Sequence, residues 1–137
     1  MDPATVFAHL NWLAVAVATL AGFLVGGLWY GPLFGREWMA LNNLTREDAR
    51  KASMAKLYGT TILLNLIAAT SLAMFIGSAG WQDGLFYGFL TGLTFVATAL
   101  GVIYVFESRP LKLWCINAGY QVVFFSVMGV ILGAWHR

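Results

Sequence analysis

Long apolar runs alternate with short charged connections along this chain. Between Pro3 and Gly35 there is no Lys, Arg, Asp or Glu, and three later stretches have the same character. A helix that crosses about 30 Å of hydrocarbon needs about 20 apolar residues. We therefore predict four transmembrane spans, at about residues 10–31, 57–76, 84–106 and 113–135.

These runs have the pattern of helices rather than of strands. No alternation of apolar and polar residues passes through them, which disfavours a β-barrel, and lipid requires backbone groups to be satisfied internally. Short connections make consecutive helices antiparallel. The predicted fold is an all-α membrane protein, an antiparallel bundle of four transmembrane helices in a single domain, residues 1–137. Because Thr45 can cap a helix, we expect the second helix to begin near Arg46, as a cytoplasmic extension.

The first span ends in the stretch "GGLWYGPLFGREWM", residues 26–39. Trp29 and Tyr30 are amphipathic aromatic residues that suit the level of the lipid headgroups. We expect Pro32 to end the helix, since the residue before a proline avoids helical conformation. The run lacks a basic leader and is too long for a cleaved signal peptide, so we interpret it as a retained helix.

Composition supports a membrane location. Apolar residues make up 60% of the chain and charged residues 10%, against about 45–50% and about 25% in soluble domains. A soluble domain of 137 residues has too little interior for so much apolar surface. The net charge of +2 is too small to suggest a nucleic-acid partner. The partner that the sequence predicts is the lipid bilayer.

The distribution of basic residues predicts the orientation. Of the eight Lys and Arg residues, seven lie in the connections 32–56 and 107–112, and the eighth is Arg137. Basic loops stay on the cytoplasmic side. We therefore expect these two connections in the cytoplasm and both termini in the periplasm, in a multi-pass protein of the bacterial inner membrane.

Three of the spans carry glycines four residues apart. Such small residues let helix backbones approach closely in lipid, where no hydrophobic force draws helices together. Two interpretations are open: a face that binds a second copy, which would make the protein a homo-oligomer, or packing within one chain. We favour the first, with the third span as the contact. The glycines are Gly22 and Gly26, then Gly84, Gly88 and Gly92, then Gly129 and Gly133.

No ionisable residue lies within a span, which disfavours proton-coupled carriers and voltage sensors. Three uncharged polar residues, Asn65, Thr98 and Gln121, each lie about 12 Å below the cytoplasmic boundary at 1.5 Å per residue, and Asn117 is one turn from Gln121. They fit either interhelical hydrogen bonds, worth about 0.6 kcal/mol per pair, or a polar pocket that opens to the cytoplasm.

Other candidates for chemistry are few. His9 and His136 lie near the outer face, where only Asp2 would add to a metal site. Cys115 lies in an apolar environment, which makes a thiol inert. No catalytic set or phosphate loop is present. We predict no enzyme, no cofactor and no metal, and the sequence indicates no particular small-molecule ligand.

Two segments together resemble a known family. The stretches "NWLAVAVATLAGFLVGGLWYGPLFGREWM", residues 11–39, and "FESRPLKLWCINAGYQ", residues 106–121, are similar to the small bacterial membrane proteins of domain of unknown function 1761. The resemblance implies a four-span inner-membrane protein and no reaction. The motif positions that carry over are Asn11, Trp29, Tyr30, Pro32, Phe34, Gly35, Trp38, Glu107, Arg109, Pro110, Asn117 and Tyr120.

Several motif positions fall in the two cytoplasmic connections. We expect them to lock these connections together, for example through Arg36 or Arg109 with Glu37 or Glu107.

Three functions fit these features. The first is a non-enzymatic, homo-oligomeric scaffold or interaction protein, and the second is a passive channel or carrier for a small neutral solute through the polar residues between the helices. The third is an enzyme or lipid-binding protein that works around Arg36, Glu107 and Arg109. We rank them in this order, because glycine faces are present and buried charges are absent.

Overall fold

The computed structural model describes residues 2–45, 47 and 54–135, and these form helices without any strand. Two π-helical turns, Trp29–Leu33 and Thr91–Val96, continue α2 and α6 respectively. The α-helices are α1 (Pro3–Ala8), α2 (Trp12–Leu28), α3 (Gly35–Leu41), α5 (Met54–Ile76), α6 (Trp81–Leu90), α7 (Ala97–Phe106) and α8 (Leu111–Ala134).

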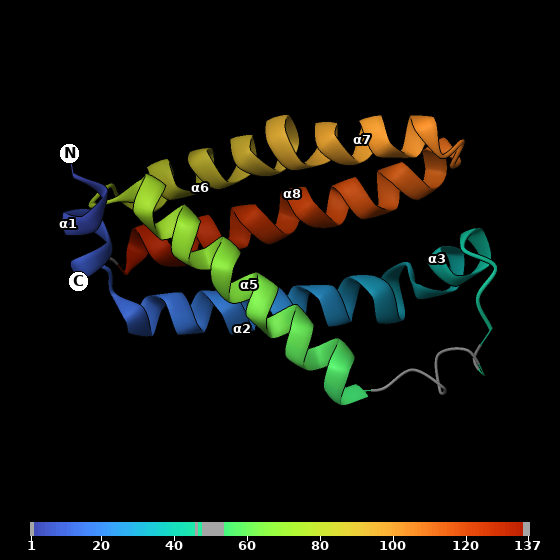
Figure 1. The fold of residues 1–137 in the computed structure, drawn as a ribbon, viewed down its shortest axis with the longest axis horizontal. Coiled ribbons are helices and arrows are strands. Elements are labelled where there is room, and N and C mark those ends of the chain that lie inside the picture. The colour runs from blue at the N-terminus through green and yellow to red at the C-terminus, as the bar shows by residue number, and fades with distance from the viewer. Residues whose placement is uncertain (1, 46, 48–53, 136–137) are drawn as a thin grey trace.

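Four helical stretches are long and apolar enough to cross a membrane: Trp12–Leu33, Met54–Ile76, Trp81–Phe106 and Leu111–Ala134. They run up and down beside one another, and α5 crosses the others at an angle (Figure 1). The prediction of an all-α bundle of four transmembrane helices is confirmed. The predicted start of α5 near Arg46 falls largely outside the described residues.

Helix α8 lies at the centre of the bundle and packs against α2, α5, α6 and α7. The main apolar core joins one face each of α2, α5 and α8. Its residues recur at intervals of three or four, as a buried helix face requires. They are Ala14, Val15 and Ala18; Ala69, Leu72, Ala73 and Ile76; and Phe124, Met128 and Leu132. The outer faces carry large exposed apolar side chains such as Leu24 and Phe75, which suit contact with lipid.

The glycines of α6 bring its backbone against that of α8. A Cβ atom added at Gly84 would run into the carbonyl oxygen of Gly129, and one at Gly88 would run into that of Phe125. A Cβ at Gly92 would lie 2.8 Å from the Cα of Val122. The expectation that this face is free to bind a second copy is therefore wrong, because α8 of the same chain covers it.

Helix α2 uses its glycines to accommodate aromatic rings. Gly22 lies against the ring of Phe124, and a Cβ at Gly26 would be 3.3 Å from the hydroxyl of Tyr120. These glycines also serve packing within one chain. In contrast, a Cβ added at Gly27 or Gly31 would meet nothing within 4 Å. Part of α2 therefore remains uncovered.

The helix that begins at Trp12 does not stop before Pro32, contrary to the expectation. It continues as a π turn to Leu33, where the N–H of Phe34 donates to the carbonyl of Trp29 at 2.8 Å. The residue before the proline is Gly31, which lacks the Cβ that would clash with the proline ring. This π turn leads directly into α3.

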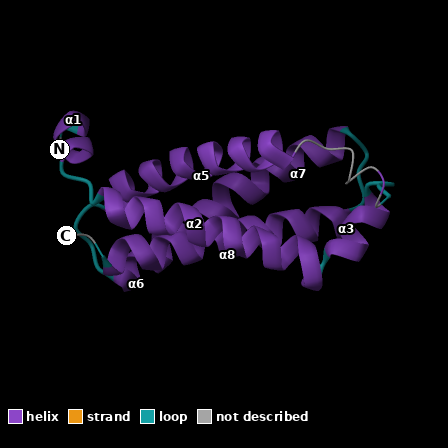
Figure 2. Ribbon diagram, turned by 90° about the horizontal axis from the view of Figure 1, so that it is seen from below, coloured by secondary structure: helices purple, strands orange, loops and turns teal. Residues whose placement is uncertain are grey.

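The two ends of the bundle differ. Helix α1 and the last turn of α8 lie at one end, and α3 lies at the other (Figures 1 and 2). At the α1 end, Asn11 caps α2 by accepting a hydrogen bond from the N–H of Ala14 at 3.1 Å. Its side-chain N–H donates to the carbonyl of Trp135 at 3.2 Å. Asn11 therefore ties the start of α2 to the end of α8.

Candidate functional site at the α3 end of the bundle

A single amide, Asn117 on α8, joins three helices at this end. The hydroxyl of Tyr30 donates to its Oδ1 at 2.6 Å, and its Nδ2 donates to the hydroxyl of Tyr104 at 2.6 Å. Tyr30 lies on the π turn that follows α2, and Tyr104 lies on α7. The amide is part-buried, so these bonds hold the three helices in one register.

Two tryptophans fix neighbouring helices through their indole N–H groups. Trp29 donates to the carbonyl of Ile116 at 2.9 Å, and Trp114 donates to the carbonyl of Ala97 at 2.9 Å. A Cβ added at Gly119 would lie 3.1 Å from the ring of Trp29. Because Gly119 has no side chain, the ring of Trp29 can pack closely against α8.

Tyr30 is also the middle of an aromatic cluster. Its ring centroid is 5.4 Å from that of Trp38 and 5.2 Å from that of Tyr120, and both pairs meet edge to face. Pairs of this geometry contribute about 0.5–1.5 kcal/mol beyond area burial. The cluster connects α3 to α8 through the end of α2.

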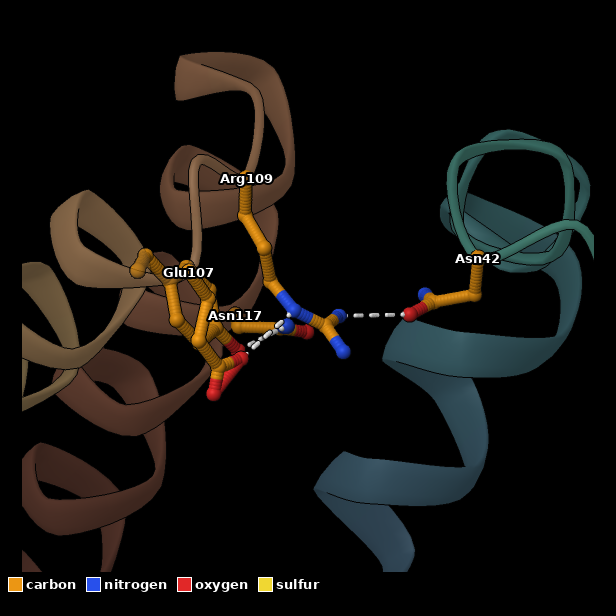
Figure 3. A network of polar contacts seen from close by, with 5 residues as sticks. Asn42, Glu107, Arg109 and Asn117 are labelled. Atoms are coloured by element: carbon orange, nitrogen blue, oxygen red, sulfur yellow. Dashed lines mark hydrogen bonds and ion pairs between the residues drawn. The ribbon is translucent and has the colours of Figure 1, made fainter.

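Above Asn117, Arg109 connects the turn between α7 and α8 to the end of α3 (Figure 3). Its Nε donates to Glu107 at 3.0 Å, and its Nη1 donates to Oδ1 of Asn42 at 2.9 Å. Asn42 in turn donates to the carbonyl of Trp38 at 2.9 Å. The guanidinium carbon also lies 5.6 Å from the ring centroid of Tyr104, a cation–π contact.

A second link joins the same two connections. The Nζ of Lys112 lies 3.2 Å from Oε2 of Glu37, and the two side chains are 63% and 51% exposed, respectively. An ion pair so exposed contributes about 0–1 kcal/mol. Of the expected locking pairs, Arg109 and Glu107 form a pair inside one connection, and Arg36 makes no ion pair with any described residue. Between the described parts of the two connections, the polar side-chain contacts are Lys112–Glu37 and Arg109–Asn42.

The remaining motif residues shape the turns of this end. A Cβ added at Gly35 would run into the carbonyl of Tyr30, so only glycine fits where α3 begins. Phe34 lies with its ring centroid 4.7 Å from that of Trp29, and Pro110 is the N-cap of α8. Motif positions from both segments therefore gather at the α3 end, and Asn11 alone of them lies at the other end.

The residues expected to form one polar layer are not linked to one another. Thr98 is exposed on α7, and its hydroxyl donates to the carbonyls of Thr94 at 2.7 Å and Phe95 at 3.0 Å. Asn65 is only 8% exposed, and its Nδ2 finds no partner among the described residues. Gln121 is half-buried and makes no side-chain hydrogen bond within them. Of the four predicted residues, Asn117 alone belongs to the site.

Sequence reasoning missed Tyr104 and Asn42. A signal for Tyr104 was its place near the end of the third span, where an aromatic hydroxyl suits the interface. Asn42 follows α3 directly, where a short amide commonly satisfies the last carbonyls of a helix.

Two grooves flank the site. One, of about 470 Å³, lies between α2 and α5 and is lined by Gly27, Gly31 and Tyr58 among others. The other, of about 640 Å³, lies between α7 and α8 and includes Arg109. A pocket of about 360 Å³ lies at the opposite end, beside α1. Within the described residues no three His, Cys, Asp or Glu side chains come together as a metal site would require.

Four apolar helices are long enough to span a bilayer, and hydrogen-bonded aromatic residues join three of them at one end. These features define a multi-pass integral membrane protein. The family model described as "Protein of unknown function (DUF1761)" matches residues 13–133, and the chain belongs to this family. No curated protein and no solved structure matches the chain. The resemblance predicted from the two motif segments is confirmed.

Proposed function

We propose that this protein is a non-enzymatic scaffold or interaction protein of the bacterial inner membrane. One observation carries this proposal: the aromatic and amide groups at the α3 end bond to one another and to main chain. Two hydrogen bonds connect Tyr30, Asn117 and Tyr104, and both indoles are bonded to carbonyls. These groups stabilise an architecture, and they are not poised to transform a substrate.

Side-chain hydrogen bonds and ring contacts hold the α3 end together, and we place this end in the cytoplasm on the distribution of basic residues. Arg36 is exposed there and carries an ion pair with no described residue. A surface held by aromatic contacts and by Arg109 keeps its shape when a partner binds, which lowers the entropic cost of association. An exposed, preorganised end of this kind suits a scaffold.

Self-association belongs to the same proposal but needs another face. The α6 glycines are covered by α8, whereas Gly27 and Gly31 line the groove of about 470 Å³ between α2 and α5. Small residues beside open space permit close approach of another helix. We therefore place the contact between copies at this groove.

The proposal is tested by the mass of the purified protein in detergent, measured by light scattering. We expect the wild type to contain at least two chains and the Gly27→Leu variant to be a monomer. Gly59→Leu is the matched control, since Gly59 also has open space around it and does not line the groove. A monomeric wild type, or dissociation by Gly59→Leu alone, would contradict the proposal.

The alternative, a passive channel for a small neutral solute, required Asn65, Thr98 and Gln121 to share one cavity. Thr98 lies on the outside of α7 with its hydroxyl bonded to its own helix. The placement of these side chains favours the scaffold.

A further inference from the structure

The groove between α7 and α8 at the α3 end has the features of a lipid site. Its volume is about 640 Å³, and its walls include Val102, Val105 and Phe106 of α7 and Leu111 of α8. Val105 is 77% exposed and Phe106 is 86% exposed. In a membrane-spanning bundle these side chains meet acyl chains rather than water.

The length of the groove matches one leaflet. It extends along α7 from Thr98 to Phe106, a rise of about 12 Å at 1.5 Å per residue. Half of a hydrocarbon core of about 30 Å is about 15 Å. The hydroxyl of Thr98, at the deep end, is already bonded to its own helix. No unsatisfied donor therefore faces an acyl chain there.

One wall of the groove is fixed before anything binds. The indole of Trp114 is held by the carbonyl of Ala97 at 2.9 Å. A Cβ added at Gly101 would lie 3.1 Å from its Nε1, so the glycine leaves room for the ring. A preformed apolar wall reduces the side-chain ordering that binding would otherwise require.

The charge at the shallow end favours an anionic headgroup. Arg109 lines the groove, and its Nη2 makes no hydrogen bond within the described residues, whereas Nε and Nη1 are bonded. The connections 32–56 and 107–112 carry seven basic and four acidic residues, a net charge of +3. Guanidinium groups form strong charge-assisted bonds with phosphate, and basic clusters attract anionic lipids.

We infer that one phospholipid with a net negative headgroup occupies this groove, with an acyl chain along Val102 and Val105 and its phosphate at Arg109. The site is separate from the groove between α2 and α5. It adds a bound lipid to the scaffold and does not depend on self-association.

The acyl-chain contact is tested by native mass spectrometry of protein released from nanodiscs with equal phosphatidylglycerol and phosphatidylcholine. We expect the wild-type protein to retain phosphatidylglycerol. The Val105→Trp variant, whose new side chain fills the groove, should retain about tenfold less, which corresponds to a loss of about 1.4 kcal/mol in binding free energy. Ile103→Trp is the matched control, because Ile103 is 50% exposed on the same helix and does not line the groove. Equal retention by both variants would overturn the inference.

The headgroup contact is tested by Arg109→Gln, with Arg36→Gln as the control at the same end. We expect Arg109→Gln alone to abolish the preference for phosphatidylglycerol over phosphatidylcholine. Arg109 also contacts Asn42 and Glu107, so Arg109→Gln can impair folding. In that case Val105→Trp still tests whether the groove binds the lipid. The inference would be contradicted if the wild type retained both lipids equally. It would also be contradicted if added inorganic phosphate displaced phosphatidylglycerol from the wild type.

Discussion

Two amides inside the bundle, one part-buried and one buried, illustrate opposite uses of the same residue type. Asn117 has a partner for each side-chain atom, at 2.6 Å on both sides. Asn65 is 8% exposed, yet its Nδ2 is buried without a partner among the described residues. An unsatisfied buried donor costs about 1–3 kcal/mol. The first amide therefore stabilises the bundle, and the second opposes its stability.

The same substitution should consequently have opposite effects at these two positions. We expect Asn117→Leu to lower the free energy of unfolding by about 1–3 kcal/mol, because two tyrosine hydroxyls lose their partner. Asn65→Leu should leave it unchanged or raise it by about 1–2 kcal/mol, since an apolar group of similar shape removes the desolvation cost. Unfolding of purified protein in mixed micelles of increasing SDS measures both. Equal destabilisation by the two variants would contradict this assignment.

The sequence predicted a common depth for three polar residues of the spans but not their partners. Counting residues along each span places Asn65, Thr98 and Gln121 at one level, because the rise per residue is constant. The direction in which each side chain points depends on how the helices rotate about their axes. Thr98 can satisfy its hydroxyl within its own helix, so no polar partner has to hold it inward.

At the scale of elements, one residue type supports two kinds of helix contact. Between α6 and α8, glycines allow backbone to meet backbone, as at Gly88 and Phe125. Between α2 and α8, glycine accommodates a ring, as at Gly22 and Phe124. The first contact has no side chain that can move aside, so it should tolerate substitution least.

We therefore expect Gly88→Leu to disrupt the bundle itself. The new side chain would meet the Phe125 carbonyl, and overpacking of this kind costs about 1–3 kcal/mol or more. Gly59→Leu, in open space on α5, should change stability by less than about 1 kcal/mol. The midpoint of thermal unfolding in detergent measures both. A fully stable Gly88→Leu protein that only changes its oligomeric mass would instead restore the α6 face as the contact between copies.

The number and class of the elements were predictable, whereas their pairing was not. Apolar runs without charge predict transmembrane helices because the bilayer sets a minimum length. Glycine spacing predicts close approach but does not name the neighbour: Gly84 and Gly88 are covered, and Gly27 and Gly31 are not. The end of the first span was misplaced for a local reason, since Gly31 before Pro32 permits a π turn.

At the scale of the whole molecule, charge and structure are polarised along the same axis. Both motif segments meet at the α3 end, where Tyr30 bonds to Asn117 and Lys112 pairs with Glu37. This end also contains the turn between α7 and α8, whereas the turn between α5 and α6 lies at the other end with α1 (Figure 1). In the sequence, basic residues are concentrated in the connections 32–56 and 107–112, whose described parts include α3 and the turn between α7 and α8. Retention of basic segments in the cytoplasm should fix the site on that side.

This orientation predicts where a membrane-impermeant maleimide can react. The chain has one cysteine, Cys115, so Cys115→Ala provides a background for two matched variants, Ser78→Cys and Ser108→Cys. Both serines are exposed in turns between spans, one at each end of the bundle. We expect Ser78→Cys to react in spheroplasts and Ser108→Cys to react only after the inner membrane is opened. The reason is that Ser108 lies in one of the two connections, 32–56 and 107–112, that carry seven of the eight Lys and Arg.

The reverse pattern would place Arg109 and the α3 end in the periplasm. An anionic lipid in the α7–α8 groove would then belong to the outer leaflet, where its headgroup would lack the cytoplasmic surface potential that favours it.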